Sequence, residues 1–242
     1  MKQILTYISP DKEFNEEHKK MVKIQIDNSL RLEWKRKDIM LVTNFKYEYN
    51  GVKSIVIPDD NYCPYLYFVT KIYVINYLFK NGLIKNGLYW YHDFDSFELN
   101  KINKDEVLDE MGVCDLGVSN YGQKIRLCSA SMFFHKSAVD IFDWLRLECD
   151  EHKINEEVAL MRIYYNKDNH LSKRIKMVNT SYAFHKFNIV KTYKTSLKPI
   201  RVAHFHITPD KYDFYVRGNN KLNMPLVPKE LINIFHKYGF KG

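Results

Sequence analysis

The sequence predicts an α/β protein with an open, mixed sheet flanked by helices. Over the first hundred residues, short apolar runs alternate with longer amphipathic segments in the order strand, helix, strand, strand, helix, strand, which is the pattern of an open α/β sheet. The 242 residues are 45% hydrophobic and 15% aromatic, so the chain can bury a sizeable core and is too apolar to be disordered. Because no repeat, low-complexity tract or linker divides it, we expect one domain over residues 1–242.

The apolar runs of the first half have the length of strands and end at turns or polar sites. The expected strands are Gln3–Ile8, Asp38–Thr43, Ser54–Ile57 and the LYWYH run at 88–92. Proline and aspartate follow the first run at Pro10-Asp11 and the third at Pro58-Asp59, and both residue types favour turns. These breaks keep the strands short, as in α/β sheets.

Two helices are expected between these strands, over residues 14–34 and Tyr65–Phe79. The apolar face of the second helix consists of Phe68, Ile72, Ile75 and Phe79. This spacing is helical, and Asn81-Gly82 then ends the helix.

The second half is expected to continue the same layers. IRLCSASMFF at Ile125–Phe134 has the apolar character of a buried strand pair, and Ser137 is placed to cap a helix that runs to about Cys149, with Asp140 completing a capping box. The later elements expected are an amphipathic helix over 156–166, a strand over Arg201–Ile207, a Gly-Asn-Asn turn at 218–220 and a helix from Pro228.

The stretch YWYHDFDSF at 89–97 places two carboxylates, Asp93 and Asp95, at the end of an apolar strand. A strand sends residues i and i+2 to one face, so both charges would project together, which is costly without a metal ion or strong donors between them. The alternative is a strand that ends at His92, with both aspartates in a solvated turn. Ligands of open α/β sheets bind beyond the carboxyl ends of strands, and this position favours a functional site.

Charge and cysteine content restrict the partners and the compartment. The formal net charge of +8 suits a nucleotide, a nucleic acid or an anionic surface, although an excess of Lys over Arg is also expected from AT-rich coding. The four cysteines lack metal-site spacing and predict reduced thiols. With neither a signal peptide nor a membrane span expected, we expect a cytoplasmic protein, in the host cytoplasm if the chain is viral.

Taken in order, these motifs resemble nucleotide-sugar-dependent glycosyltransferases of the GT-A fold, especially small viral and phage members. The resemblance covers most of residues 1–210 and depends on YWYHDFDSF as the Asp-x-Asp site, CSASMFF, NEEVALMRI and a late AHFH. It implies a Rossmann-like sheet in a single domain. Residues 1–100 would form mainly the donor side, and residues 101–242 mainly the acceptor side with a late metal ligand.

The resemblance also implies a divalent metal, Mn²⁺ or Mg²⁺. Asp95 would bind the metal directly, while Asp93 would contact the ribose or bind the metal through water. His204 or His206, two residues apart on a strand, would complete the metal shell, and imidazole suits manganese. The alternative for this pair is two histidines at a sheet edge, satisfied by water.

Other side chains are candidates for the donor and for catalysis. The donor set is Thr6, Tyr7 and Ser9 at the nucleobase, Lys71 at the nucleotide, and Lys211 and Arg217 at the diphosphate. For Lys71 the alternative is a side chain that snorkels at the rim of the sheet. The catalytic or acceptor-binding acid would be Glu156, Glu157 or Asp150, and inverting and retaining mechanisms both stay open.

The implied activity is transfer of a sugar from a nucleotide-sugar donor, a UDP-sugar first, to a hydroxyl of a glycan, a protein or a hydroxymethylated DNA base. One alternative is a haloacid-dehalogenase-type phosphatase, although Ser-Phe-Glu follows Asp95 here and the motif lies nearly a hundred residues into the chain. The other alternative is a non-enzymatic nucleic-acid-binding domain, favoured by the positive charge and the abundant tyrosine.

Overall fold

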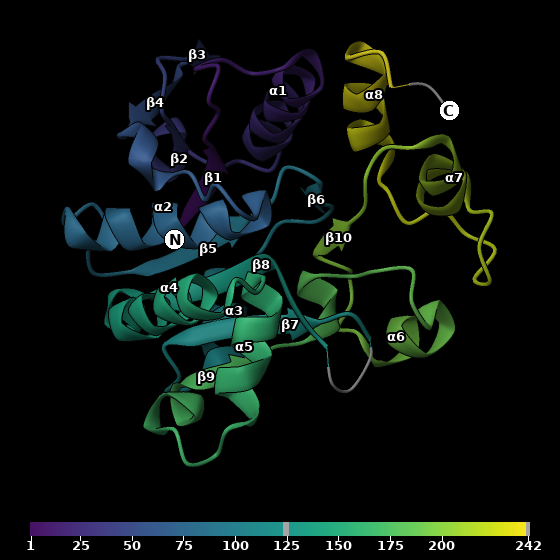
Figure 1. Ribbon diagram of the computed structural model, residues 1–242. Coiled ribbons are helices and arrows are strands. Elements are labelled where there is room, and N and C mark those ends of the chain that lie inside the picture. The colour runs from purple at the N-terminus through teal and green to yellow at the C-terminus, as the bar shows by residue number, and fades with distance from the viewer. Residues whose placement is uncertain (123–125, 241–242) are drawn as a thin grey trace.

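An eight-stranded sheet forms the centre of the molecule (Figure 1). The computed structural model describes residues 1–122 and 126–240, and its strands lie in the order β3-β4-β2-β1-β5-β8-β7-β9. Their bounds are β1 Lys2–Tyr7, β2 Ile39–Thr43, β3 Glu48–Tyr49, β4 Val52–Val56, β5 Leu88–His92, β7 Leu116–Asn120, β8 Leu127–His135 and β9 Ile175–Met177. Strands β4, β2, β1 and β5 are parallel, whereas β8 runs antiparallel to β5 and β7. The expected mixed α/β sheet is confirmed.

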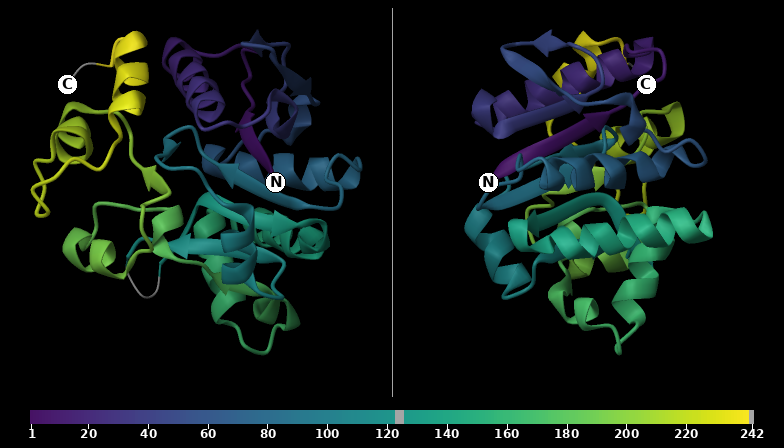
Figure 2. Two further views of the ribbon diagram at one scale, coloured as in Figure 1. Left: turned by 180° about the vertical axis from the view of Figure 1, so that it is seen from behind. Right: turned by 60° about the vertical axis from the view of Figure 1, so that its left-hand side comes forward.

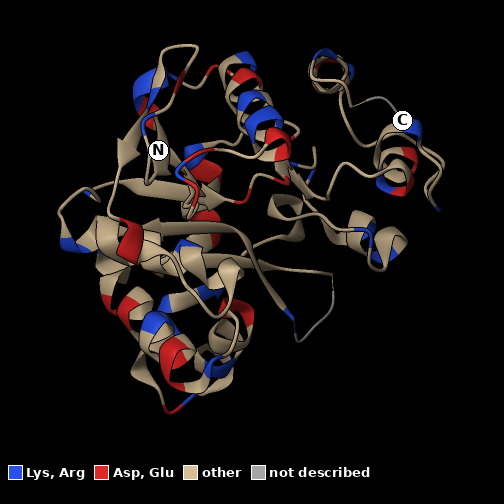
Figure 3. Cartoon of the chain, turned by 45° about the horizontal axis from the view of Figure 1, so that its top comes forward, with Lys and Arg blue, Asp and Glu red and all other residues tan. Residues whose placement is uncertain are grey.

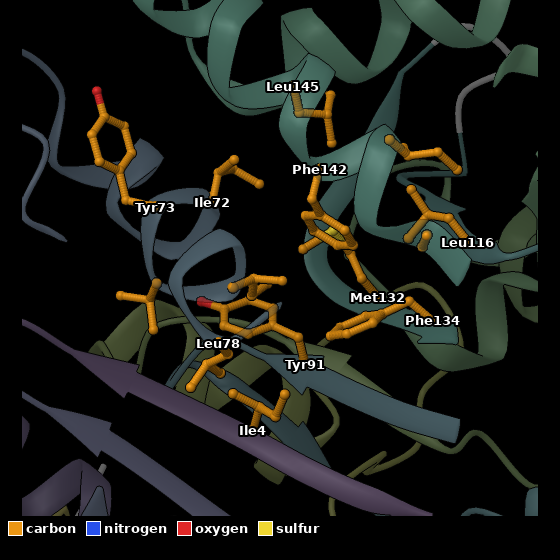
Figure 4. Close-up of a cluster of buried hydrophobic side chains, with 14 of the residues drawn as sticks. Ile4, Ile72, Tyr73, Leu78, Tyr91, Leu116, Met132, Phe134, Phe142 and Leu145 are labelled. Atoms are coloured by element: carbon orange, nitrogen blue, oxygen red, sulfur yellow. The ribbon is translucent and has the colours of Figure 1, made fainter. Parts of the chain in front are cut away.

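Helices cover both faces of this sheet. They are α2 (Thr70–Lys80), α4 (Val139–His152) and α5 (Glu156–Tyr165) on one face, and α1 (Glu16–Arg31) and α3 (Lys104–Met111) on the other. Successive residues of β1 divide between the two cores: Ile4 belongs to the cluster around Phe142 (Figure 4), whereas Leu5 packs in the cluster of Val22. This division follows from the two-residue period of a strand.

The later part of the chain folds back beside the N-terminal part. Strand β10 (Val202–His204) pairs antiparallel with β6 (Ser96–Glu98) in a second, two-stranded sheet. Around it lie α6 (Ile189–Thr195), α7 (Pro209–Tyr212), the π-helical turn Asp213–Arg217 and α8 (Lys229–Lys237). Figure 2 shows α8, in yellow, standing beside α1, in purple. The β6–β10 pairing places His204 opposite Ser96, next to the loop that follows β5.

Asp27 joins α8 to α1. Its Oδ2 lies 2.7 Å from the Nζ of Lys237 and accepts a hydrogen bond from the Tyr238 hydroxyl at 2.6 Å. Tyr49 and Asn50 also donate to this carboxylate. Burial raises the pKa of Asp27, but these donors outweigh it and hold the pKa below its ordinary value. A carboxyl with a depressed pKa stabilises the fold above its unfolded pKa, and that stability is lost as the pH falls through the folded pKa.

We therefore expect Asp27→Asn to lower the free energy of unfolding by about 1–3 kcal/mol at pH 7, because donors that face a carboxylate would lose its charge. The difference from the native protein should shrink as the pH falls below about 4. Urea denaturation at neutral and acidic pH measures both values. Asp109→Asn, at an exposed position of α3, is the matched control, and an equal loss at both pH values would contradict the expectation.

Several expected elements are confirmed with small changes in bounds. The helix over 14–34 is α1, which begins after the N-cap Asn15. The helix from Pro228 is α8, with Pro228 as its N-cap. The turn at 218–220 forms at Gly218, whose positive φ of 79° suits glycine. The strand expected over Arg201–Ile207 is shorter, because β10 ends at His204.

Three details of the expected elements are wrong. Leu127–His135 is one long strand, β8, and its neighbour is β7, which the sequence analysis missed; Ile125 lies outside the described residues. Ser137 caps nothing, because Ala138 is the N-cap of α4 and the Ser137 hydroxyl donates to Asp115. Phe68 lies in a 3₁₀ turn before α2 and is 57% exposed, so it does not belong to the buried face.

In the part of the chain that the structure describes, no helix combines the length and the apolar character that crossing a bilayer requires.

Candidate active site

A cavity of about 640 Å³ opens where β1 and β5 end, at the carboxyl edge of the parallel strands. This edge is where open α/β sheets bind ligands. The residues of the expected site that line the cavity are Thr6, Tyr7, Lys71, Asp93, Asp95, Glu156, Glu157, His204 and His206. Side chains from both halves of the sequence therefore meet in one cavity.

The loop after β5 carries the two aspartates. β5 ends at His92, and the Ser96 amide donates to the Asp93 carbonyl at 3.0 Å, so Asp93 and Asp95 lie in a turn rather than on one face of a strand. They are nevertheless not solvated, because their side chains are only 25% and 14% exposed. Gln25 of α1 donates to the Phe94 carbonyl at 2.6 Å and holds this turn against the protein. The alternative was right that the strand ends at His92 and wrong that the aspartates are solvated. The expectation that both side chains project from one face of a strand is wrong, but both are partly buried.

Asp95 is paired with two histidines. The Nε2 atoms of His204 and His206 each lie 3.2 Å from the Asp95 Oδ2, although β10 ends at His204 and His206 follows the strand. Burial raises the pKa of Asp95, but the imidazoles outweigh it and hold the pKa well below its ordinary range. For His204, burial lowers the pKa, while the Asp95 carboxylate raises it well above its ordinary value. Asp95 therefore lies between two imidazoles, each in contact with the same carboxylate oxygen.

This group has the residue types of a metal site, but it does not form a complete set of metal ligands. Among the described residues, no group of three or more His, Cys, Asp or Glu side chains is placed so that it could hold a metal ion by itself. The 3.2 Å between the Asp95 oxygen and each imidazole nitrogen nevertheless matches the ~3 Å between neighbouring ligands of an octahedral ion with bonds of about 2.1 Å. Carboxylate and imidazole together suit Mn²⁺. The residues therefore fit a divalent metal whose remaining ligands come from elsewhere.

Lys71 forms ion pairs with two carboxylates that line the cavity. Its Nζ lies 2.8 Å from the Asp93 Oδ2 and 3.1 Å from the Glu156 Oε1, and it donates to the Ser129 hydroxyl at 3.2 Å. Burial lowers the pKa of Lys71, but Asp93 and Glu156 outweigh it and raise the pKa well above its ordinary value. The side chain is only 7% exposed, which rules out the alternative of snorkelling at the rim. Lys71 is a fixed, buried positive charge.

Glu156 lines this cavity and has one buried carboxylate oxygen without a partner among the described residues. Its Oε1 accepts a hydrogen bond from Ser129 at 2.8 Å and faces Lys71, while its Oε2 is buried without a hydrogen-bond partner among the described residues. The neighbouring Glu157 is held by Tyr121, whose hydroxyl donates to it, and by Arg126 at 3.6 Å. Burial raises the pKa of Glu157. A buried acceptor without a donor is costly, so the Glu156 Oε2 is a polar atom that the described residues leave unsatisfied.

The sequence analysis missed several residues that hold these groups in place. The Tyr91 hydroxyl donates to the Asp93 Oδ1 at 2.5 Å, and its place two residues before Asp93 was a signal that could have identified it. Ser129 and Tyr121 carried no such signal, because their partners lie far away in the sequence.

Tyr7, which was expected at the nucleobase, packs against Phe14 and His18, with ring centroids 4.8 and 4.6 Å apart.

Four residues expected in the site do not line the cavity. Ser9 is buried beside Asn44 and accepts a hydrogen bond from the Asp11 amide. Asp150, on α4, accepts hydrogen bonds from the hydroxyls of Tyr65 and Tyr73. Lys211 pairs with Asp210, and Arg217 pairs with Asp213. Their contacts account for these side chains without a ligand.

No protein-family model and no curated protein matches the chain, but solved structures do. The galactosyltransferase LgtC, in complex with donor and acceptor sugar analogues, is 12% identical; the match covers 97% of this chain and 100% of that one, with a TM-score of 0.60. A glycosyltransferase involved in glycosylation of the major capsid of PBCV-1 is 10% identical, with 88% and 97% covered and a TM-score of 0.55. GlyE of Streptococcus pneumoniae TIGR4 is 8% identical, with 98% and 60% covered and a TM-score of 0.59. The chain has the GT-A fold, as expected.

Proposed function

We propose that this GT-A chain is a metal-dependent glycosyltransferase, which moves a sugar from a nucleotide sugar, a UDP-sugar first, to a hydroxyl group. The observation that carries the proposal is the composition of one cavity. It is lined by the Asp95–histidine group, the buried cation Lys71 and Glu156, whose buried Oε2 has no partner among the described residues. A sugar diphosphate presents the complementary groups, because it is anionic at one end and carries hydroxyls at the other.

Each group then has a task in the transfer. A divalent metal, Mn²⁺ or Mg²⁺, supplies electrophilic stabilisation of the leaving diphosphate when it is bound, and Asp95, His204 and His206 would hold it. Asp93 is oriented by Lys71 and Tyr91, which suits a contact with the ribose or with a metal-bound water.

The donor would extend from this centre toward the end of β1. Thr6 and Tyr7 line the cavity at the end of β1, where the nucleobase is proposed to lie. Lys211 and Arg217 were proposed for the diphosphate, but neither lines the cavity, because Lys211 pairs with Asp210 and Arg217 pairs with Asp213.

Glu156 is the best placed of the three candidate acids. Glu156 lines the cavity and its buried Oε2 has no partner among the described residues, whereas Glu157 is already bound by Tyr121 and Asp150 lies outside the lining. Glu156 would accept a hydrogen bond from a hydroxyl of the donor sugar or of the acceptor.

A thermal-shift panel tests the proposed function. Uridine, guanosine and cytidine diphosphate sugars are added with and without Mn²⁺, because a ligand that binds only the native state stabilises it by mass action. We expect one nucleotide to raise the melting temperature, and only with metal present. No shift with any of the donors would contradict the proposal.

His204→Ala is expected to weaken Mn²⁺ binding about 10–100-fold, the usual range for a group that supports a metal site. Calorimetric titration of Mn²⁺ into the folded variant, with the nucleotide found in the panel, gives the affinity. His170→Ala, at an exposed position outside the cavity, is the matched control. Unchanged affinities for His204→Ala and for His206→Ala would remove both residues from the metal site.

A further inference from the structure

The excess of positive over negative charge in this protein arises in one continuous segment. Residues 169–209 contain eight Lys and Arg and no Asp or Glu, whereas the remaining 201 residues contain 29 basic and 29 acidic residues. The formal net charge of +8 therefore lies entirely within this acid-free segment. AT-rich coding would enrich Lys along the whole chain, so it does not explain why acidic residues are missing from one segment.

Most of these charges have no acidic partner in the structure. Arg174 and Arg201 form ion pairs with aspartate or glutamate. The other six cations of the segment form no ion pair among the described residues, and they are Lys173, Lys176, Lys186, Lys191, Lys194 and Lys198. An unneutralised cluster of like charges lowers the stability of the compact state through self-repulsion, and a bound polyanion would relieve it.

Four of the unpaired lysines gather around α6, and we call Lys186, Lys191, Lys194 and Lys198 the lysine surface. Lys191 and Lys194 are exposed three residues apart on α6, so they project from neighbouring positions of one side, while Thr192 and Ile189 are buried. In Figure 3 the ribbon of α6 carries blue and no red. A seven-residue helix is only about 10 Å long, so Lys191 and Lys194 lie close together, while Lys186 and Lys198 each lie three residues beyond an end of α6.

The lysine surface begins at the rim of the proposed active site. Tyr121 lines the cavity and packs against His185 and Phe187, with ring centroids 5.3 and 6.3 Å apart. These two residues lead directly into α6. Arg126 also lines the cavity, 4.9 Å from the Tyr121 ring. A chain of phosphates bound along α6 would therefore pass the mouth of the cavity.

The structure also indicates which polyanion fits. The exposed positions of α6 are Lys191, Lys194 and Thr195, so the helix itself has no exposed apolar face of the kind that inserts into a membrane, and Leu197, 45% exposed beyond its end, is a single apolar residue. Phe187, at the rim, is 37% exposed, and an exposed aromatic ring can stack on a base. Repeated lysines with an adjacent aromatic are the combination that binds nucleic acids.

We propose that the lysine surface binds the phosphate backbone of a nucleic acid and presents a hydroxyl-bearing base to the cavity as the sugar acceptor. This proposal deepens the proposed function and rests on it. The base hydroxyl oxygen would bond to the anomeric carbon as the bond from that carbon to the diphosphate breaks. The diphosphate leaves with the electron pair, and the hydroxyl proton passes to a carboxylate of the cavity or to solvent. The base has to leave the stack to reach the cavity.

The binding test uses a fluorescent duplex that contains hydroxymethylated bases, at about 50 to 200 mM salt. The variant is Lys191→Gln/Lys194→Gln/Lys198→Gln, which spares Lys186 because it adjoins Lys211. The control is Lys37→Gln/Lys85→Gln/Lys136→Gln, three exposed lysines that precede β2, precede β5 and follow β8. These positions lie at the opposite edge of the sheet, and both variants change the net charge equally.

For the native protein we expect log affinity to fall linearly with log salt, by about 0.9 per phosphate contact. The α6 variant should lose at least about 10-fold in affinity near 100 mM salt, and its slope should decrease by up to about three contacts. The control variant should keep both values. Transfer of radiolabelled sugar to modified but not to unmodified duplex would support the acceptor assignment.

Three outcomes would overturn the inference: a flat salt response, equal losses in the two variants, or binding of heparin as tight as that of DNA. Donor-induced thermal shifts are measured on the same native and variant proteins. A donor shift without DNA binding removes this inference alone. The absence of any donor shift removes the proposed function, and the salt dependence then still decides whether the surface binds nucleic acid.

Discussion

Asp95→Asn is expected to reduce sugar transfer at least about 10³-fold while the protein remains folded. Asp95 supplies the one charge to which both imidazoles point, with each Nε2 3.2 Å from the same oxygen. An amide keeps the shape but removes the negative charge that holds a divalent cation. Electrophilic stabilisation by a metal contributes several kcal/mol to the transition state, and about 4 kcal/mol corresponds to a factor of ~10³ in rate.

The measurement is the initial rate of transfer at saturating Mn²⁺, with the donor identified by thermal shift. Asp11→Asn is the matched control, because it makes the same chemical change at an exposed position outside the cavity. Circular dichroism of both variants reports folding. Turnover of Asp95→Asn close to that of the control would exclude Asp95 as a metal ligand.

Lys71→Met is expected to lower the free energy of unfolding by about 3–5 kcal/mol, the usual cost of leaving buried charges without their partner. The Nζ of Lys71 contacts both Asp93 and Glu156, and the Lys71 and Glu156 side chains are 7% and 5% exposed. Methionine fills a similar volume but leaves two carboxylates facing each other without a cation. Urea denaturation followed by circular dichroism gives the value.

Lys80→Met provides the control on the same helix. Lys80 pairs with Asp143 at 3.6 Å in an exposed position, where ion pairs contribute about 0–1 kcal/mol. Adding Glu156→Gln to Lys71→Met removes one of the two uncompensated charges and should recover part of the loss. A loss for Lys71→Met no larger than that of Lys80→Met would show that the buried pairs do not stabilise the fold.

The sequence alone determined those features that depend on neighbouring residues. The apolar run LYWYH became β5, and the amphipathic segment over 14–34 became α1, because the solvent exposure of a strand or helix repeats with its own short period. The same short-range pattern of residues identified Asp93 and Asp95 at the end of a strand. It also singled out His204 and His206, although their contacts with Asp95 depend on the tertiary structure.

Only the tertiary structure decided how these pieces meet. The strand after Arg126 is a single strand inserted antiparallel between β5 and β7, and this places Ser129, 58 residues from Lys71 in sequence, within hydrogen-bond distance of its amine. Lys71 itself interrupts an apolar helix and could have snorkelled to water. Its burial followed from the two carboxylates that the sheet brings to the same point.

The turn at Asp93–Asp95 shows the same division. Residue types and spacing identified this stretch as unusual, but the strand-face geometry predicted from them is wrong, because the chain turns after His92 and Gln25 of α1 holds the turn. Ser9 and Asp150 were plausible from their positions in sequence, yet their side chains bond to groups outside the cavity. Periodicity and residue type are local properties that a sequence displays directly, whereas the partner of a buried charge depends on strand order and pairing, which form only when distant segments pack together.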